Sequence, residues 1–427
     1  MKIAMVTNTY TPHVGGVARS VQSFTDAYRA RGHEVLVVAP TYPGCAPTEP
    51  GVYRVKALQN VYDSGFSLAL PVPGQVSQAV DAFGPDVVHS HHPILLGDTA
   101  MRLAASRGLP IVFTHHTMYE HYTHYYPGDS EKLRRFVSAI ATGYANLCDL
   151  VFAPSESVRD TIRRRGVEAT IEVVPTGIDV DAFRAGDGRA FREAHGLPDN
   201  AFVVGHLGRL APEKNLEWLA RAIAAFAKDR PEVHVLIVGK GPSQEPVRRI
   251  FRQAGLADRL VMPGALTGDD LTGAYAAMDA FAFASVSETQ GLVLTEAMAT
   301  GTPVVAIDAP GAREVVRDGE NGRLLRDPDE AAFAEALAWT ADRPAGEAEA
   351  LRAAASRTAD AFSIDATADA ALGHYTSLIE SGAPRAAQAD GWSIVMRRLE
   401  AEWNLLSSTA DALGTAFTTQ ALDEELR

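Results

Sequence analysis

The feature that most constrains the fold is the alternation of short apolar runs with amphipathic stretches along most of the chain. Runs of strand length, rich in β-branched residues, are followed repeatedly by segments with apolar residues every three or four positions. Apolar runs that are joined through helices are typical of parallel sheets covered by helices on both faces. The runs that we expect to form strands are residues 2–8, 33–40, 86–91, 110–116 and 150–155, followed by 201–209, 233–241, 260–265, 280–285 and 303–308.

The alternation of strands and helices is interrupted by a Pro/Gly turn in "IEVVPTGIDVDAF" (residues 171–183) and then resumes. At 427 residues the chain is also long enough for more than one domain. We therefore predict an α/β protein with two doubly wound, Rossmann-like domains that face each other across a cleft. The predicted bounds are 1–178 and 179–361 for the two domains, 362–382 for a following helix and 385–427 for an amphipathic helical tail.

Composition excludes several classes of function. The net charge of −14 argues against a nucleic-acid binder, because phosphate backbones require a basic face. Cys45 and Cys148 supply neither a disulfide framework nor a Cys-based zinc site, which favours a reducing compartment. No stretch approaches the ~20 apolar residues of a membrane span. We expect a cytoplasmic protein that touches a membrane, if at all, only at its cytoplasmic face.

The tail contains apolar residues in alternating steps of four and three. Such a heptad seam fits a partner helix and predicts a homodimer through residues 392–417. One amphipathic helix packed on its own domain explains the same pattern, so both interpretations stay open. The seam consists of Trp392, Met396, Leu399, Trp403, Leu406, Ala410, Leu413 and Phe417.

Two motifs that suit anions fall at predicted strand ends, where doubly wound sheets bind ligands. The loop "YTPHVGGVARS" brings Gly15 and Gly16 to the start of a helix, where backbone N–H groups can approach an anion. "GHLGRLAPEKN" carries Arg209 and Lys214, a cationic pair suited to a diphosphate. A simple turn and two solvated cations are the alternatives.

"ETQGLVLTEAMATGTPVVA" contains two glutamates, Glu288 and Glu296, eight positions apart. Eight helical residues rise ~12 Å, which is too far for one metal ion with ligands at ~2.6 Å or for glycosidase carboxylates ~5–9.5 Å apart. An azimuthal difference of ~80° places Glu288 in the loop before the helix. An elongated ligand with hydroxyls at both ends and an anion between them fits this spacing, as in a nucleotide sugar. The backbone N–H groups that would face the anion are those of Thr289, Gln290, Gly291 and Leu292.

Together with "GRLAPEK" and "PTGID", this segment closely resembles the retaining glycosyltransferases of family 4, which have the GT-B fold. The resemblance runs from residue 1 to about residue 380. It implies that Glu288 contacts the donor hexose and Glu296 the ribose hydroxyls. It implies further that Arg209 and Lys214 hold the diphosphate, with Gly16 near it, and that the helix 362–382 crosses back to the first domain. Gln290 stands where many relatives carry an aromatic residue.

The resemblance also extends to an acceptor side. In "THHT" (114–117), His116 aligns with a histidine that contacts the sugar in relatives. "THHTMYEHYTHYYPGD" resembles the branch that glucosylates diacylglycerol, with an aromatic rim suited to a lipid interface and "EKLRRF" near anionic head groups. The acceptor-side residues so implied are Tyr119, Tyr122, His124, Tyr125 and Tyr126. The rival interpretations are plain aromatic packing and a zinc site drawn from His89, His91, His92, His115, His116, His121 and His124, although zinc-binding spacing is missing.

The resemblance therefore implies a retaining, metal-independent hexosyltransferase. UDP-glucose is the favoured donor, a membrane lipid hydroxyl such as diacylglycerol is the favoured acceptor, and no cofactor is expected. Neither "DVD" (179–181) nor "DPD" (327–329) suits a metal-bound diphosphate, so the cationic pair and the helix N-terminus would neutralise the leaving nucleotide. The alternatives are a GDP-mannose-dependent mannosyltransferase, transfer to a soluble sugar or polyol, a sugar-nucleotide epimerase, and a non-catalytic sugar-nucleotide-binding scaffold.

Overall fold

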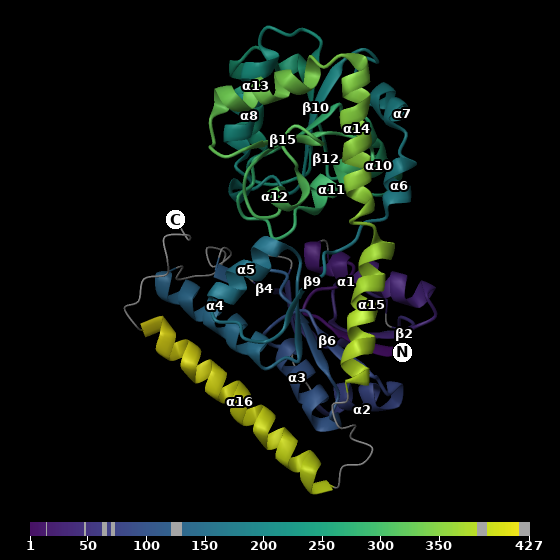
Figure 1. The fold of residues 1–427 in the computed structure, drawn as a ribbon, viewed down its shortest axis with the longest axis vertical. Coiled ribbons are helices and arrows are strands. Elements are labelled where there is room, and N and C mark those ends of the chain that lie inside the picture. The colour runs from purple at the N-terminus through teal and green to yellow at the C-terminus, as the bar shows by residue number, and fades with distance from the viewer. Residues whose placement is uncertain are drawn as a thin grey trace. The chain divides into compact units, whose positions relative to one another are not determined.

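The chain forms two compact units, which Figure 1 shows in a computed structural model. The first unit consists of Met1–Gly177 and Thr367–Arg427, and the second of Ile178–Ala366. The structure describes residues 1–13, 15–46, 48–61, 66–69, 73–120, 130–381 and 391–417.

The first unit is built on a parallel sheet, which within the described residues has seven strands in the order β3-β2-β1-β6-β7-β8-β9. The apolar strands lie at its centre, where Ile3 of β1 is fully buried between Val35 and Val87. The order reverses between β1 and β6, so the carboxyl ends of these strands form the point where doubly wound sheets bind ligands. The strands are β1 (Lys2–Val6), β2 (Glu34–Pro40), β3 (Val52–Val55), β6 (Val87–Ser90), β7 (Ile111–Thr114), β8 (Leu150–Ala153) and β9 (Ile171–Val173), with a separate antiparallel pair β4 (Ala57–Val61) and β5 (Phe66–Ala69).

Helices cover this sheet, and side-chain caps fix where several of them start. Ser130 accepts a hydrogen bond from the Leu133 N–H at 3.2 Å, and Ser155 does the same for Val158, so each satisfies a donor of its helix's first turn. The helices are α1 (Gly16–Ala30), α2 (Pro73–Phe83), α3 (Leu96–Arg107), α4 (Glu131–Asn146), α5 (Glu156–Arg164), α15 (Ile364–Glu380), which enters this unit at Thr367, and α16 (Gly391–Phe417).

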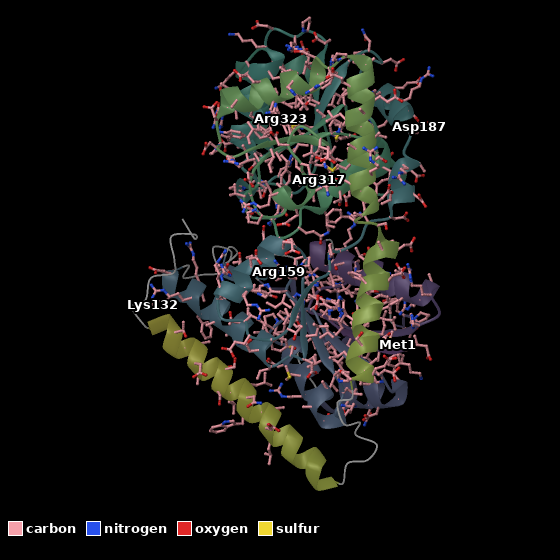
Figure 2. All side chains as sticks on the ribbon, in the orientation of Figure 1. Met1, Lys132, Arg159, Asp187, Arg317 and Arg323 are labelled. Carbon is pink, nitrogen blue, oxygen red and sulfur yellow. The ribbon has the colours of Figure 1, made fainter. Side chains whose placement is uncertain are left out.

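The second unit has the same plan, with six described strands in the order β12-β11-β10-β13-β14-β15, all parallel. Neighbouring residues of β10 alternate between the two faces, since Val203 and Val204 belong to different hydrophobic clusters. Side chains fill the space between sheet and helices (Figure 2). The order reverses between β10 and β13. The strands are β10 (Phe202–Leu207), β11 (Val233–Val238), β12 (Leu260–Gly264), β13 (Ala280–Phe283), β14 (Val304–Ile307) and β15 (Gly322–Leu325).

The helices of the second unit lie on both faces of its sheet (Figure 1). They are α6 (Val180–Arg184), α7 (Gly188–Ala194), α8 (Leu216–Ala227), α9 (Gln244–Gln253), α10 (Gly268–Ala276), α11 (Leu292–Ala299), α12 (Ala312–Val315), α13 (Glu330–Ala341) and α14 (Ala345–Asp360), with 3-10 turns η2 (Pro212–Lys214) and η3 (Ala257–Arg259).

The predicted fold class is confirmed, and each predicted strand is present with its ends shortened. The sequence did not predict β3, β9, β15 or the β4–β5 pair, which are strands of three to five residues. In most of these strands a polar residue interrupts the apolar run, as in VYRV and ALQNV, so no continuous apolar stretch marks them. Across the helices that the structure describes, none has both the length and the apolar character needed to cross a bilayer.

Candidate active site

The point of strand-order reversal in the second unit brings together residues far apart in sequence. Lys214, just beyond β10, forms an ion pair with Glu288, which follows β13. Arg209 lies at the same strand end and pairs with Glu213, while half of its side chain remains exposed. The structure thus places the predicted cationic pair and Glu288 at one sheet edge, and each cation already has a carboxylate partner.

The loop that carries Glu288 is held by two glycines. Helix α11 begins at Leu292 with Gly291 as its N-cap, so Glu288 lies in the loop before the helix, as predicted. Gly291 and Gly311 have φ of 72° and 84°, which other residues adopt only with strain. A Cβ at Gly311 would also lie 2.8 Å from that of Glu288. Thr289 and Gln290 lie in the same loop, just before the N-cap Gly291.

Buried polar atoms without hydrogen-bond partners surround the same sheet edge. They are His206 Nε2, Ser285 Oγ and Ser287 Oγ. His206 Nδ1 lies 3.0 Å from the Ala282 carbonyl oxygen and must donate to it, which leaves Nε2 as an acceptor in the neutral ring. Burial lowers the pKa of His206 to about 4, so the ring is neutral at pH 7. Buried groups of this kind require a partner, and a polar ligand would supply one.

These three residues were not predicted from the sequence. His206 stands within the quoted "GHLGR", but only the strand register shows that it lies near Lys214 and Glu288. Glu213, the partner of Arg209, was also not predicted, because a glutamate next to a predicted helix start is common and does not by itself indicate a site.

Glu296 is placed differently from Glu288. It lies on α11, is 1% exposed and accepts a hydrogen bond from the Tyr275 hydroxyl at 2.5 Å. The two glutamates therefore do not line one exposed surface. The contact of Tyr275 with Glu296 was not expected from the sequence.

In the first unit, the ends of β1 and β6 are tied together by Asn8. Its backbone N–H donates to His92 Nδ1 at 3.1 Å, and its side-chain oxygen accepts from the Leu96 N–H at 3.1 Å. Gly15 is the N-cap of α1 and Gly16 its first residue, as predicted. A Cβ at Gly16 would meet no atom within 4 Å, so the backbone there is open to approach.

Histidines crowd the same edge of the first sheet. His116 Nε2 lies 2.9 Å from His91 Nδ1, and one of these two nitrogens donates to the other. His89 contacts the Thr114 hydroxyl at 2.7 Å and the Tyr375 hydroxyl at 2.5 Å. Burial lowers the pKa of each ring, to about 3 for His89 and His92, to about 4 for His115, and well below the usual value for His91 and His116. These imidazoles are therefore neutral.

The histidines were also the basis of the rival zinc interpretation. No three His, Cys, Asp or Glu side chains are grouped to share a metal ion in the part of the chain that the structure describes. His121 and His124 lie outside that part.

Most of the predicted acceptor side, namely Tyr122, His124, Tyr125 and Tyr126, also lies outside the described residues. The ring of Tyr119 stands edge-on to His115, and its hydroxyl is buried without a partner. Burial raises the pKa of Tyr119 well above its usual value. Tyr119 is half-buried, and its hydroxyl points into the protein. Within "EKLRRF", Lys132 is exposed, whereas Arg135 is paired with Glu131.

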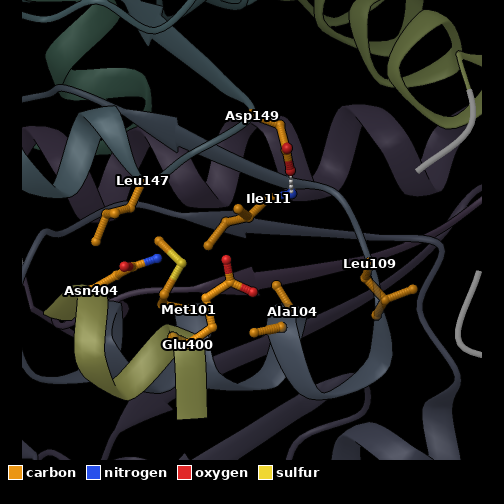
Figure 3. A pocket seen from close by; sticks show the side chains of 10 residues that line it. Met101, Ala104, Leu109, Ile111, Leu147, Asp149, Glu400 and Asn404 are labelled. Atoms are coloured by element: carbon orange, nitrogen blue, oxygen red, sulfur yellow. Dashed lines mark hydrogen bonds between the residues drawn. The ribbon is translucent and has the colours of Figure 1, made fainter. Parts of the chain in front are cut away.

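A cavity of about 230 Å³ lies elsewhere in the first unit, between α16 and the amino ends of β7 and β8 (Figure 3). Met101, Leu109 and Leu147 supply apolar walls, and Asp149 accepts the Ile111 N–H at 2.8 Å. The histidines occupy the carboxyl ends of the strands, so the cavity is at the opposite edge of the sheet.

Comparison with known proteins identifies the class of enzyme to which the chain belongs. Residues 14–182 match the family described as Glycosyltransferase Family 4, and residues 187–358 match Glycosyl transferases group 1. The solved structure of Anabaena HepE in complex with UDP and glucose superposes with a TM-score of 0.69 at 22% identity, over 88% of this chain and 100% of that one. The two doubly wound units and these matches define a glycosyltransferase with the GT-B fold.

Two curated relatives give the family. A GDP-mannose-dependent alpha-mannosyltransferase of Mycolicibacterium smegmatis is 30% identical over 393 residues, which cover 91% of this chain and 100% of the relative. An alpha-monoglucosyldiacylglycerol synthase of Streptococcus pneumoniae is 29% identical over 358 residues, 80% of this chain and 79% of the relative. The chain belongs to glycosyltransferase family 4 and is a hexosyltransferase, which confirms the resemblance seen in the sequence motifs.

Proposed function

We propose that this hexosyltransferase moves glucose from UDP-glucose to a membrane lipid hydroxyl such as diacylglycerol, with retention of anomeric configuration and without a metal ion. The observation that carries the proposal is the Lys214–Glu288 ion pair at the point of strand-order reversal in the second unit. It combines a cation for a phosphate with a carboxylate for sugar hydroxyls at the ligand-binding edge of a doubly wound sheet.

The ion pairs suggest how a donor is accepted. Lys214 and Arg209 are held by Glu288 and Glu213, so an incoming diphosphate exchanges one anionic partner for another. The cations then neutralise the charge that develops on the leaving nucleotide. Glu288, released from Lys214, becomes an acceptor for the hexose hydroxyls. The unpartnered His206, Ser285 and Ser287 offer further hydrogen bonds.

The remaining donor contacts are proposed from the family resemblance. Glu296 is the proposed ribose ligand, with one of its oxygens fixed by Tyr275. Gly15 and Gly16 are proposed to lie near the diphosphate, and His116 near the donor hexose. The His91 contact at 2.9 Å would fix the orientation of the His116 ring.

For the chemical step we propose attack on the face from which the leaving group departs. The acceptor oxygen forms a bond to the anomeric carbon, and the bond from that carbon to the nucleotide diphosphate breaks. The acceptor proton passes to the departing phosphate oxygen. This route requires no covalent enzyme intermediate and keeps the anomeric configuration.

Support for a lipid acceptor comes from the name of the Streptococcus pneumoniae relative, and we propose peripheral contact with a membrane on that basis. The Mycolicibacterium smegmatis relative supports a second candidate, in which GDP-mannose is the donor. Both donors carry the diphosphate that Arg209 and Lys214 would hold, so donor competition must separate them.

The test is a transfer assay with the purified full chain. UDP-[14C]glucose and GDP-[14C]mannose are each incubated with diacylglycerol vesicles, with glycerol or inositol, and without acceptor. We expect label in an α-glucosyl lipid, with the anomer assigned by NMR. Label from GDP-mannose alone would replace the glucosyl proposal with the mannosyl candidate, and label in the polyols alone would reject the lipid acceptor. Lys214→Ala should lower transfer ~10²–10³-fold, while Arg221→Ala, which removes an exposed arginine paired with Glu330 on the same unit, should retain it.

A further inference from the structure

Helix α16 has one face that packs on its own unit. Ala401 and Ala412 are buried on this face, and Leu405 packs against the hydrophobic core of the first unit. Ser408 lies directly over α4, because a Cβ at Gly143 would come within 2.0 Å of its hydroxyl oxygen. The helix lies against α3 and α4 (Figure 1), through a face other than the predicted heptad seam.

The opposite face of α16 is apolar and exposed. Its exposed fractions are 58% for Leu399, 71% for Trp403, 66% for Leu406 and 48% for Leu413, and Ala410 between them is also exposed. These residues are the described middle of the predicted heptad seam and extend ~21 Å along the helix. A line of large apolar side chains on a protein surface marks an interaction site.

We propose that this outward face pairs antiparallel with the same face of a second copy of the chain. The steps of four and three are those of a seam whose side chains insert between side chains of another helix. A helix that lies on a membrane carries Lys and Arg along its polar face. Helix α16 has two basic residues, Arg397 and Arg398, and none from residue 399 to 417, where it has Glu400, Glu402 and Asp411.

Side-chain size favours the antiparallel direction. A two-fold pair must be complementary to itself. With the axis between residues 404 and 405, Trp403 lies opposite Leu406 of the second copy, and Leu399 opposite Ala410. A parallel pair in register would instead set Trp403 against Trp403 and Ala410 against Ala410, which crowds one layer and leaves a gap in another.

The flanking charges agree with this register. Glu402 is already held by Arg102 at 2.5 Å, so it brings no unpaired charge to the seam. In the antiparallel pair Glu400 lies opposite Ser407 and Glu402 opposite Thr409, so no two acids meet.

The helix is ~40 Å long and, at a width of ~10 Å, would cover roughly 400 Å² per chain, about half of a standard interface. We therefore expect a reversible dimer with a micromolar dissociation constant.

The first test is sedimentation equilibrium of the full chain between about 1 and 100 µM, the range that an interface of this size requires. We expect a monomer–dimer equilibrium, and a Trp403→Glu/Leu406→Glu variant should raise its Kd at least ~100-fold by burying unpaired charge. Thr415→Glu adds the same charge at an exposed position outside the seam and should leave the Kd unchanged. Because the substituted side chains are exposed, circular dichroism should show an intact fold in each variant.

Cysteine cross-linking tests the direction, in a Cys45→Ser background. A Leu399→Cys/Ala410→Cys chain should form an interchain disulfide, since these positions face each other in the antiparallel pair. Leu399→Cys alone should not, because its two copies would be ~16 Å apart along the axis. Efficient cross-linking by Leu399→Cys alone would reject the antiparallel register. A chain that stays monomeric at all concentrations, yet binds phospholipid vesicles through Trp403, would assign the face to a membrane and overturn the proposal.

Discussion

Two sheet edges with the same topology differ in their chemistry. In the first unit the carboxyl ends of the strands form a histidine edge, which consists of His89, His91, His92, His115 and His116. In the second unit they form a charged edge, which consists of Arg209, Glu213, Lys214 and Glu288. The histidines are neutral because burial lowers the pKa of each ring, whereas the charged edge keeps its ions in pairs near the surface.

The difference indicates which substrate each edge suits. A charged edge with exchangeable pairs suits an anion, because the diphosphate can replace the carboxylates. A neutral edge suits a group without charge, such as an alcohol, because an anion there would lose hydration without gaining a cation. We therefore expect a change of pH to alter the stability of the first unit. Substitutions that remove a charge from the second unit's edge should alter the rate of transfer from the donor.

The largest expected effect is loss of stability on acidification, confined at first to the first unit. A histidine with an ordinary pKa of about 6.5 binds a proton in the unfolded chain, while the buried ring at about 3 or 4 does not. The stabilisation is therefore complete above pH ~6.5 and falls as the pH drops toward the folded value, by about 1.4 kcal/mol per pH unit for each ring. The histidine edge has five such rings, whereas His206 is the buried equivalent among the residues described for the second unit.

Hydrogen exchange at pH 7 and pH 5, corrected for intrinsic rates, measures this directly. Peptides of β6 and β7 should lose protection at pH 5, while peptides of β10 and β13 in the same sample serve as the control. If the second unit opens first, the histidine edge is not the acid-labile part of the molecule.

The next largest effect is expected at the charged edge. Arg209→Ala or Lys214→Ala removes a cation from the site where negative charge develops, and loss of one such group costs ~10²–10³ in turnover. Arg221→Ala is the matched control, because it removes an exposed, paired arginine from the same unit. Initial rates at saturating donor decide the matter. Near-normal turnover in both variants would remove the diphosphate role from this edge.

How far the sequence predicts these edges depends on which interactions are local. The central strands were predictable because residues such as Ile3 and Val204 belong to runs that are buried on both faces. The loop position of Glu288 followed from helical geometry alone. Its pairing with Lys214 joins residues 74 positions apart and depends on β10 lying beside β13, which no local pattern specifies.

In the tail, too, the sequence predicts a local pattern but not which neighbouring elements it contacts. Its heptad seam was evident in the sequence, yet the seam is exposed and a second face packs on the unit. That second face is marked by the small residues Ala401, Ser408 and Ala412, which have too weak an apolar signal to be recognised without the neighbouring helix.

A smaller effect should separate the two glutamates of the second unit. Glu288→Gln should lower kcat by ~10–100-fold, because the neutral amide accepts a weaker hydrogen bond from a hexose hydroxyl near the reacting carbon than the charged carboxylate does. Glu296→Gln should instead weaken donor binding, and Tyr275→Phe should do so to a lesser degree, since Tyr275 holds the Glu296 carboxylate. Donor titrations give kcat and KM for each variant. The reverse pattern would mean that the donor lies in the opposite direction along α11.

The smallest expected effect is that of metal removal. If Arg209 and Lys214 carry the charge of the leaving diphosphate, transfer should proceed at an unchanged rate after exhaustive EDTA treatment and in metal-free buffer. The same cations give the experiment its control, because Mg²⁺ added to Lys214→Ala should not restore transfer if the lysine acts by direct contact rather than by general screening. Rates are compared before EDTA, after EDTA, and after return of Mg²⁺ or Mn²⁺. Complete loss with EDTA and recovery with either ion would show that the charged edge is insufficient alone, and the contrast between an ionic and a neutral edge would then have to include a bound metal.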